Sequence, residues 1–286
     1  MRLLITLFCL LLAFSAIAQY SDEQLLEGVY DIPEAISELI VKNHHGRVVI
    51  EGSDRSDIAY EIRMIIKARS QEKVQKGMEE MEMAWLKEDS FLVLTPDAPW
   101  IIRRDCVSQH GWTDMREKPP YDYQIDVKLV VPKGLLISAF TIDKGDVIIS
   151  SIDQANTVGH VNGDIFLTDV GSIHKINSVN GNIELDGADM DFGKEELIID
   201  TINGKILVLL SDRSDLSVHF KSMNGSFYTE LPVTDKPGKI LKTIKTDDGG
   251  TLYLYSQYTS VDVGRGGKDI YVETLNGNVY LKKQSK

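Results

Sequence analysis

The sequence predicts an all-β protein built as a parallel β-helix, or β-solenoid, with one helix in a small α+β insertion that caps it. The main observation is a repeat: VNGDIFL at 161–167 returns as VNGNIEL at 179–185, and further Asn-Gly copies follow. After each glycine, apolar residues alternate with other residues, which is typical of a short strand with one buried face. Only one stretch, at 70–88, has the apolar spacing of a helix. We expect the solenoid to be right-handed.

Residues 1–18 have the features of a signal peptide. Arg2 provides a positive charge, residues 3–14 form a short apolar run, and Ala16 and Ala18 occupy the small-residue positions of a cleavage site. The apolar run is short for a membrane-spanning helix, although an uncleaved anchor is the alternative. We therefore expect a mature chain that starts at Gln19 and an extracytoplasmic location, in the periplasm, at the outer surface or secreted.

The composition is that of an ordinary folded protein, with 43% hydrophobic and 26% charged residues. Signal cleavage would change the formal net charge from −12 to −13, because Arg2 is the one charged residue removed. A chain this acidic repels phosphate groups, so we expect neither nucleic acid nor an anionic membrane surface as a partner. No transmembrane segment is expected after cleavage. The mature chain keeps only Cys106, so it cannot form an intramolecular disulfide.

We divide the chain into a signal peptide at 1–18, an N-terminal region at 19–134 that caps the solenoid, and solenoid repeats at 135–286. The segment IVKNHHGRVVIEG at 40–52 already fits the repeat, so the solenoid is expected to begin near residue 40 and then to be interrupted. Strands are predicted in the interruption by alternating or apolar runs. These runs lie at 57–68, 90–96 and 123–134.

The predicted helix at 70–88 begins at Ser70, whose hydroxyl can cap it. An apolar stripe with spacings of four, three and four residues lies along one side of this helix. We expect the stripe to pack over the open first coil of the solenoid. It consists of Val74, Met78, Met81 and Trp85.

The repeats could form a row of hairpins, because Asn-Gly is also a hairpin turn signal. We favour stacked solenoid units of roughly twenty residues, which cannot bury their own faces alone. Apolar residues lie five and two positions before each glycine, as Ile199 and Ile202 do before Gly204. This spacing of three is interpreted as a bend of the chain. Stacking would align the repeat asparagines in a hydrogen-bonded ladder, for which a ligand role is the alternative. They are Asn162, Asn180, Asn203, Asn224 and Asn276.

The residue three positions after each aligned glycine is expected to point outward, because it lies between two inward-facing positions. Several of these residues are aromatic, and stacking would place them in one exposed stripe. We interpret the stripe as a ligand-binding face for sugar rings or a protein partner. The alternatives are a plain strand preference of aromatic residues and cover by the N-terminal helix. The stripe includes Phe166, Tyr228, Tyr253 and Tyr280.

Two sets of side chains could carry metal or catalytic chemistry. His44 and His45 are adjacent, but neighbouring residues on a turn point apart, so a degenerate turn is favoured over a metal site. Cys106, His110 and Asp114 lie in a long loop, which does not by itself bring a nucleophile and its base together. The loop also offers too few ligands for zinc. We expect no metal site and no cofactor.

Two acidic features could also bind a cation or act on a substrate. The acidic segment 186–196 lacks the glycine that an EF-hand requires, so we expect an inter-coil loop there rather than a calcium site. Asp146 and Asp164 directly follow aligned glycines and could be neighbours across coils. They are the candidate carboxylate pair of a polysaccharide-active enzyme.

The N-terminal module with its helix, the strand end at Val131–Gly134 and the Asn-Gly-x-apolar-x-apolar copies resemble the putative adhesin family of secreted bacterial β-helical proteins. The resemblance covers residues 38–283. It implies export, a parallel β-solenoid and a surface or envelope role, and it supplies no catalytic residues.

We therefore expect a non-enzymatic cell-envelope or surface protein, either an adhesin-like binding protein or a structural one. A glycan or an envelope protein is the expected kind of partner. The alternative is a polysaccharide-active β-helix enzyme, a lyase or a hydrolase.

Overall fold

The computed structural model is all-β, with one helix among the residues that it describes. The backbone alone is described for 114–115, 240–245 and 251–255. The described residues are 19–102, 114–115, 118–188, 190–191, 196–236, 240–245, 251–255 and 258–284.

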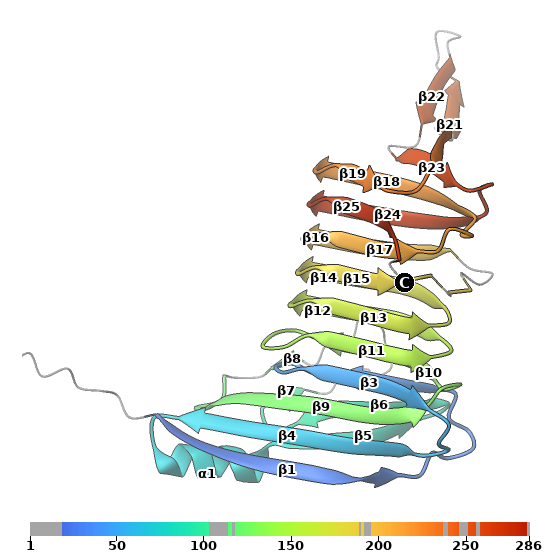
Figure 1. Cartoon of the computed structure of the whole chain (residues 1–286). Helices are drawn as coiled ribbons and strands as arrows, with labels where there is room; N and C mark the ends of the chain where they lie inside the picture. Colours follow the sequence, from blue (N-terminus) through green and yellow to red (C-terminus); the bar gives the residue numbers. More distant parts are fainter. Residues whose placement is uncertain are drawn as a thin grey trace, which may run out of the picture.

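Two large mixed sheets make up most of the molecule (Figure 1). The ten-stranded sheet, called sheet A, has the order β1 (Tyr20–Tyr30), β4 (Ile58–Ala68), β9 (Asp122–Pro132), β3 (Val48–Ser53), β11 (Val147–Ile152), β13 (Ile165–Val170), β15 (Ile183–Asp186), β17 (Ile206–Leu210), β25 (Val279–Lys283) and β19 (Phe227–Thr229).

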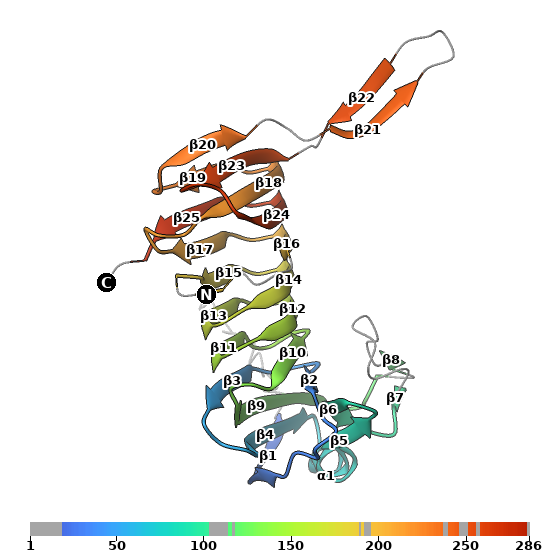
Figure 2. The same cartoon turned by 90° about the vertical axis from the view of Figure 1, so that its right-hand side faces the viewer.

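The eleven-stranded sheet, called sheet B, lies against sheet A for most of its length (Figure 2). Its order is β20 (Val233–Lys236), β23 (Thr259–Val263), β18 (Leu216–Asn224), β24 (Lys268–Asn276), β16 (Leu197–Asn203), β14 (Ile173–Asn180), β12 (Ala155–Asn162), β10 (Leu136–Thr141), β2 (Glu38–Lys42), β6 (Phe91–Asp97) and β5 (Glu82–Glu88). Two small sheets pair β21 (Ile240–Lys245) with β22 (Thr251–Tyr255), and β7 (Ile101–Ile102) with β8 (Asp114–Met115).

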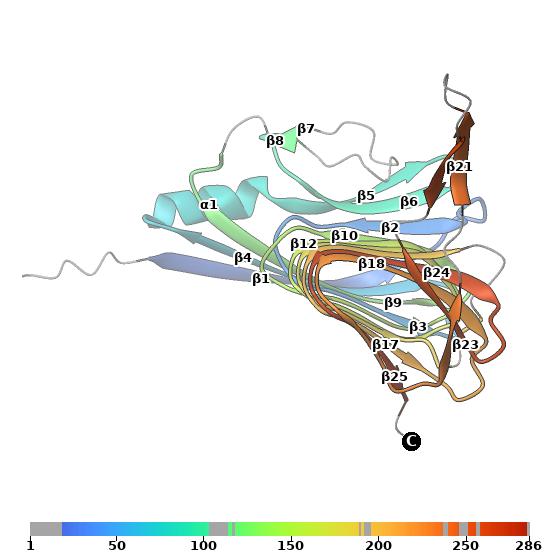
Figure 3. The same cartoon turned by 90° about the horizontal axis from the view of Figure 1, so that it is seen from above.

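The repeats alternate between the two sheets. Each repeat contributes a strand of sheet B, an Asn-Gly turn and a strand of sheet A, and we call this unit a rung. Equivalent strands of neighbouring rungs pair in parallel, so that Ile165, Ile183 and Ile206 align across sheet A. Seen from above, the strands of successive rungs lie over one another (Figure 3). The row of antiparallel hairpins, which was the alternative to stacked units, is therefore absent from the rungs that the structure describes.

The core lies between the two sheets and is filled by the inward side chains of each rung. These side chains have no exposed surface, which is the arrangement that maximises hydrophobic stabilisation of stacked short strands. They include Ile165, Ile183, Ile206 and Val279 from sheet A, and Ile176, Ile199 and Val272 from sheet B.

The predicted bend before each Asn-Gly pair is wrong. Strands β14, β16 and β24 continue without interruption to their asparagines, and the turn begins at the glycine. Residues five and two positions before the glycine are separated by an odd number, so a continuous strand places them on opposite faces. Ile199 is fully buried, whereas Ile202 is 43% exposed. The second apolar position thus belongs to the outer surface of sheet B.

The rungs are not stacked in the order of the sequence. The last rung, β24–β25, lies between β16–β17 and β18–β19, and it pairs in parallel with both (Figure 1). After β18–β19 the chain forms β20 and the β21–β22 hairpin, and β23 then returns antiparallel to β18. Sheet B therefore ends in antiparallel strands, which pair the outer edge of β18.

The predicted helix at 70–88 is too long. Helix α1 spans Gln71–Glu80, and Ser70 caps it by accepting a 3.4 Å hydrogen bond from the Lys73 N–H. Met81 is already extended, and Trp85 lies in β5, opposite Leu94 of β6. Pairing with β6 on one side gives the backbone of 82–88 hydrogen-bond partners as an edge strand of sheet B, which outweighs its helical spacing.

The other strands predicted in the N-terminal region are present, whereas β1 was not predicted. The runs at 57–68, 90–96 and 123–134 form β4, β6 and β9, and the segment 40–52 supplies β2 and β3 of a first rung. Strands β1, β4 and β9 are antiparallel and end sheet A, with α1 packed against β1 and β4. No helix in the described part of the chain is long and apolar enough to cross a membrane.

Candidate functional site

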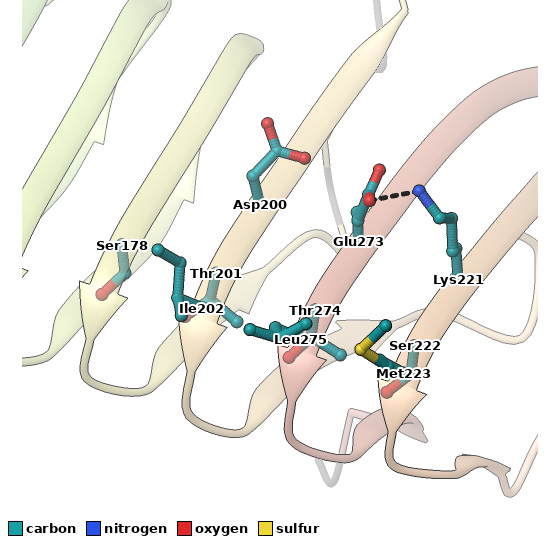
Figure 4. Close-up of a pocket in the computed structure, with 10 residues that line it drawn as sticks. All are labelled: Ser178, Asp200, Thr201, Ile202, Lys221, Ser222, Met223, Glu273, Thr274 and Leu275. Carbon is teal, nitrogen blue, oxygen red and sulfur yellow. Dashed lines mark hydrogen bonds and ion pairs between the residues drawn. The ribbon is translucent and has the colours of Figure 1, made fainter.

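A groove with a volume of about 640 Å³ runs across the ends of four neighbouring strands of sheet B (Figure 4). The strands are β14, β16, β24 and β18, so the groove spans rungs that are far apart in the sequence. Three rows of residues line it, each row taken from equivalent positions of the rungs. They are Ile202, Leu275 and Met223; Asp200, Glu273 and Lys221; and Ser178, Thr201, Thr274 and Ser222.

The first row is aliphatic and exposed. Ile202, Leu275 and Met223 each precede the asparagine of a rung, and they are 43%, 41% and 77% exposed. The residues flanking them pair in register across β16, β24 and β18, so the three side chains lie side by side. Sequence reasoning interpreted the spacing of this position from the buried one as a bend, although that odd spacing was the signal that could have revealed an outward side chain.

The second row is charged and lies two residues earlier on the same strands. Asp200 pairs in register with Glu273, and Glu273 with Lys221. Lys221 Nζ lies 2.5 Å from Glu273 Oε1, and the Tyr258 hydroxyl donates a 2.9 Å hydrogen bond to Glu273 Oε2. On the other side, Lys175 Nζ lies 3.7 Å from Asp200 Oδ2. The two carboxylates are thus neighbours, each with an ammonium partner on its far side.

The pKa values of the two carboxyl groups are pushed in opposite directions. Burial raises the pKa of Asp200, against the opposing effect of Lys175. The hydrogen bond from Lys221 lowers the pKa of Glu273. Burial also raises the pKa of Tyr258 to about 12, so this phenol stays protonated near neutral pH. Neighbouring carboxyls with divergent pKa values are a pattern found in catalytic sites as well as in structural ion pairs.

The third row lies between the other two rows along the strands, and strand alternation turns its side chains toward the opposite, inner face of sheet B. Ser178, Thr201 and Thr274 are at least nine-tenths buried, and their hydroxyl oxygens have no hydrogen-bond partner among the described residues. Buried hydroxyls usually find a partner, so these three groups are an exception, but they lie on the core side of sheet B and do not face the groove.

The five asparagines of the predicted ladder form one row at the strand ends, beside the aliphatic row. The row holds four hydrogen bonds: the Nδ2–H of every asparagine except Asn162 donates to the Oδ1 of the asparagine before it in the row, at 2.7–2.9 Å. The spatial order follows the rungs and not the sequence: Asn162, Asn180, Asn203, Asn276, Asn224.

The predicted aromatic stripe is only partly assembled. Tyr228 and Tyr280 lie side by side on sheet A, with ring centroids 5.0 Å apart and planes inclined by 11°. Phe166 occupies the same row, but Glu184 and Leu207 separate it from Tyr280.

The placement of Tyr253 in this stripe is wrong. It lies in β22, which pairs only with β21 in a two-stranded sheet. Its segment is an insertion in the rung order, so the alignment on glycine did not apply to it.

The carboxylates of the pair predicted from the sequence accept hydrogen bonds between rungs. Asp146 and Asp164 are neighbours, and each accepts a hydrogen bond from a backbone N–H of the next rung. The Asp164 N–H donates to Asp146 Oδ1 at 3.1 Å, and the Asn182 N–H donates to Asp164 Oδ1 at 2.7 Å. Their carboxylates therefore join rungs together.

Among the described residues, the remaining candidate side chains do not come together into a metal or catalytic site. His44 is buried and lies 3.0 Å from the Tyr123 hydroxyl, and burial lowers its pKa to about 4. Burial also lowers the pKa of His45. No group of three His, Cys, Asp or Glu side chains in the described ranges is arranged to hold a metal ion.

Several of these candidates lie wholly or partly outside the described residues. Cys106 and His110 are outside them, and the Asp114 side chain is not described. Part of the acidic segment 186–196 is also outside.

Comparison with known proteins gives only distant structural likenesses. No protein-family model matches the sequence, and no curated protein matches it. A putative cell adhesion protein from Clostridium sporogenes is 9% identical over 93% of this chain and 100% of its own, with a TM-score of 0.41. A putative adhesin from Bacteroides fragilis is 11% identical over 91% and 97%, with a TM-score of 0.34. A putative lipid binding protein from Parabacteroides distasonis is 10% identical over 93% and 97%, with a TM-score of 0.28. At these scores the likenesses carry no argument about ligand or activity.

Proposed function

We propose that the chain is an exported, non-enzymatic β-solenoid protein of the cell envelope or surface, which binds a partner through the outer face of sheet B. The stacked parallel rungs support the solenoid assignment, and the signal-like residues 1–18 support export. The resemblance of the repeats to the putative adhesin family supports a surface role.

The groove on sheet B is the observation that carries the binding proposal. Ile202, Leu275 and Met223 expose aliphatic surface on three adjacent strands, and contiguous exposed apolar patches usually mark contact sites. The charged row lies two residues away, which is about 6.6 Å along a strand. A ligand that fits must therefore be amphipathic, with an apolar side toward these residues and a polar side toward Asp200 and Glu273.

The test compares two variants of the mature chain. The groove variant carries Ile202→Ser, Leu275→Ser and Met223→Ser. The control variant carries Leu25→Ser and Val29→Ser, which remove side chains of similar exposure, 52% and 56%, from β1 at the other end of the molecule. Ligands are first identified with a glycan array and envelope extracts, and their affinities are then measured by calorimetry.

The expected result is a loss of at least about tenfold, or about 1.4 kcal/mol, for the groove variant alone. Equal affinities of the two variants would show that the groove is not the contact face. A third variant, Tyr228→Ser with Tyr280→Ser, tests the stacked tyrosines of sheet A as a second contact. Export itself is tested by mass spectrometry of the mature N-terminus, which is expected at Gln19.

A polysaccharide-active enzyme is the second candidate, and the carboxyl pair Asp200 and Glu273 favours it. Asp200, whose pKa is raised by burial, lies beside Glu273, whose pKa is lowered by the hydrogen bond from Lys221, and acid–base hydrolysis of a glycosidic bond uses two carboxyl groups whose pKa values differ in this way. The test incubates the wild type and Asp200→Asn with a panel of anionic and neutral polysaccharides. Release of reducing ends or of unsaturated products by the wild type alone would establish the enzyme; no release by either protein would support the binding function.

A further inference from the structure

A second cavity, at the N-terminal end of the molecule, is lined by four methionines. Its volume is about 610 Å³, and Met64, Met78, Met81 and Met83 all line it. The full sequence has eight methionines, so half of them converge on this one cavity. This cavity is separate from the groove on sheet B, so a ligand bound in it would be independent of the proposed function.

Three structural elements bring the four side chains together. Met78 lies in the last turns of α1, and Met81 caps that helix with its N–H bonded to the Gly77 carbonyl at 3.0 Å. Met78 and Met81 are three residues apart at this end of the helix, and both line the cavity. Met83 follows two residues later in β5, and Met64 comes from β4, against which α1 packs.

The cavity is buried on one side and partly open on the other. Met64 and Met81 are 3% and 4% exposed, whereas Met78 and Met83 are only partly buried and pack against the core. The other lining residues include three carboxylates and no histidine or cysteine. The carboxylates are Glu79, Glu80 and Glu82, of which Glu80 is paired with Lys76, whose Nζ lies 3.4 Å from Glu80 Oε1.

The chemistry of these groups selects one class of ion. A thioether is a soft, uncharged ligand, which favours Cu(I) over hard or borderline divalent ions. Zinc prefers thiolate, imidazole or carboxylate ligands in a tetrahedral set, and the described residues of this cavity provide no imidazole or thiolate. Methionine is also an ordinary core-filling residue, but filling a core does not require four of them at one cavity. We propose that the cavity binds Cu(I) through the thioether sulfurs of Met64, Met78, Met81 and Met83.

The experiment uses the mature chain with Cys106→Ser, because a free thiol would itself bind Cu(I). Cu(I) affinity is measured without oxygen, in ascorbate, by competition with a chromophoric Cu(I) chelator. Met78→Leu with Met81→Leu keeps side-chain volume and removes two sulfurs. The matched control is Met223→Leu, which alters a methionine 77% exposed on sheet B.

The expected result is one equivalent of bound Cu(I), with affinity at least about tenfold weaker in the double variant and unchanged in the control. A second experiment makes no substitution at the site. Ag(I) is titrated into the protein, and the NMR signals of its labelled methionine methyl groups are recorded. Shifts are expected for the four cavity methionines and not for Met223. Absence of binding in the Cys106→Ser protein, equal loss in both Leu variants, or Ag(I) shifts spread over all methionines would each overturn the proposal.

Discussion

The asparagine row allows a prediction that depends on the spatial order of the rungs. The Asn276 side chain makes two hydrogen bonds in the row: its Nδ2–H donates to Asn203 at 2.7 Å, and its Oδ1 accepts from Asn224 at 2.8 Å. Asn224 ends the row and makes only the second of these. Sequence order would instead make Asn276 the terminal member, with Asn224 inside the row.

The expected loss of stability follows from counting these bonds. A hydrogen bond contributes a net 0.5–1.5 kcal/mol, roughly, and these side chains are exposed, so water replaces the lost partner and the low end applies. Asn276→Ala should therefore cost about 1 kcal/mol, and Asn224→Ala about half of that. Asn203→Ala should match Asn276→Ala, because Asn203 also has a neighbour on each side.

Urea denaturation of the mature chain, followed by circular dichroism, measures the free energy of unfolding of each variant. The double variant Asn276→Ala with Asn224→Ala is the sharpest test, because the single bond of Asn224 is already lost in Asn276→Ala. The double variant should therefore be no less stable than Asn276→Ala alone. Additive losses in the double variant, or equal losses for Asn276→Ala and Asn224→Ala, would refute the reasoning.

Two further predictions concern a buried histidine and a glycine. Burial lowers the folded-state pKa of His44 to about 4, below its unfolded value of about 6.5. The part of the folding stability that depends on a neutral His44 is therefore fully present above pH 6.5 and is lost as the pH falls toward 4. Between these limits the wild type should lose about 3 kcal/mol more stability than His44→Gln, as measured by urea titrations at several pH values; parallel pH profiles would contradict this. Gly277→Ala should destabilise by about 1–3 kcal/mol, because its Cβ would overlap the carbonyl oxygen of Gly204 in the next rung. The control Gly134→Ala, whose Cβ would meet its nearest atom at 3.7 Å, should leave the thermal midpoint unchanged; equal shifts of both midpoints would rule out the close approach.

The local structure of each rung was predictable from the sequence because it depends on neighbours along the chain. Alternating apolar residues after each glycine predicted strands such as β13 and β17, with Ile165 and Ile206 inward, and both are fully buried. The cap at Ser70 was predictable for the same reason, since its partner is the N–H of Lys73, three residues away.

The turn signal that identified the glycine of each Asn-Gly pair explains only part of the requirement for glycine at this position. A turn signal implies a need for positive φ, yet Gly204 alone among the described Asn-Gly glycines has one, at 153°. In Gly181, Gly204 and Gly277 a Cβ would overlap the carbonyl oxygen of an adjacent rung. The requirement for glycine is therefore the close approach of stacked backbones, which exists only in the assembled structure.

What the sequence determined by itself is thus the content of the rungs: their strands, their inward side chains and the asparagine at each turn. What only the tertiary structure decided is how the rungs and the inserted segments meet. It inserted β24–β25 beside β16–β17, moved Tyr253 out of the aromatic row, and turned Ile202 and its equivalents outward. It also ended α1 before Met83 and brought this residue to Met64. Periodicity along the chain specifies which face of a strand is apolar, but pairing energy between distant strands selects the neighbour, and that selection is not encoded at any fixed spacing.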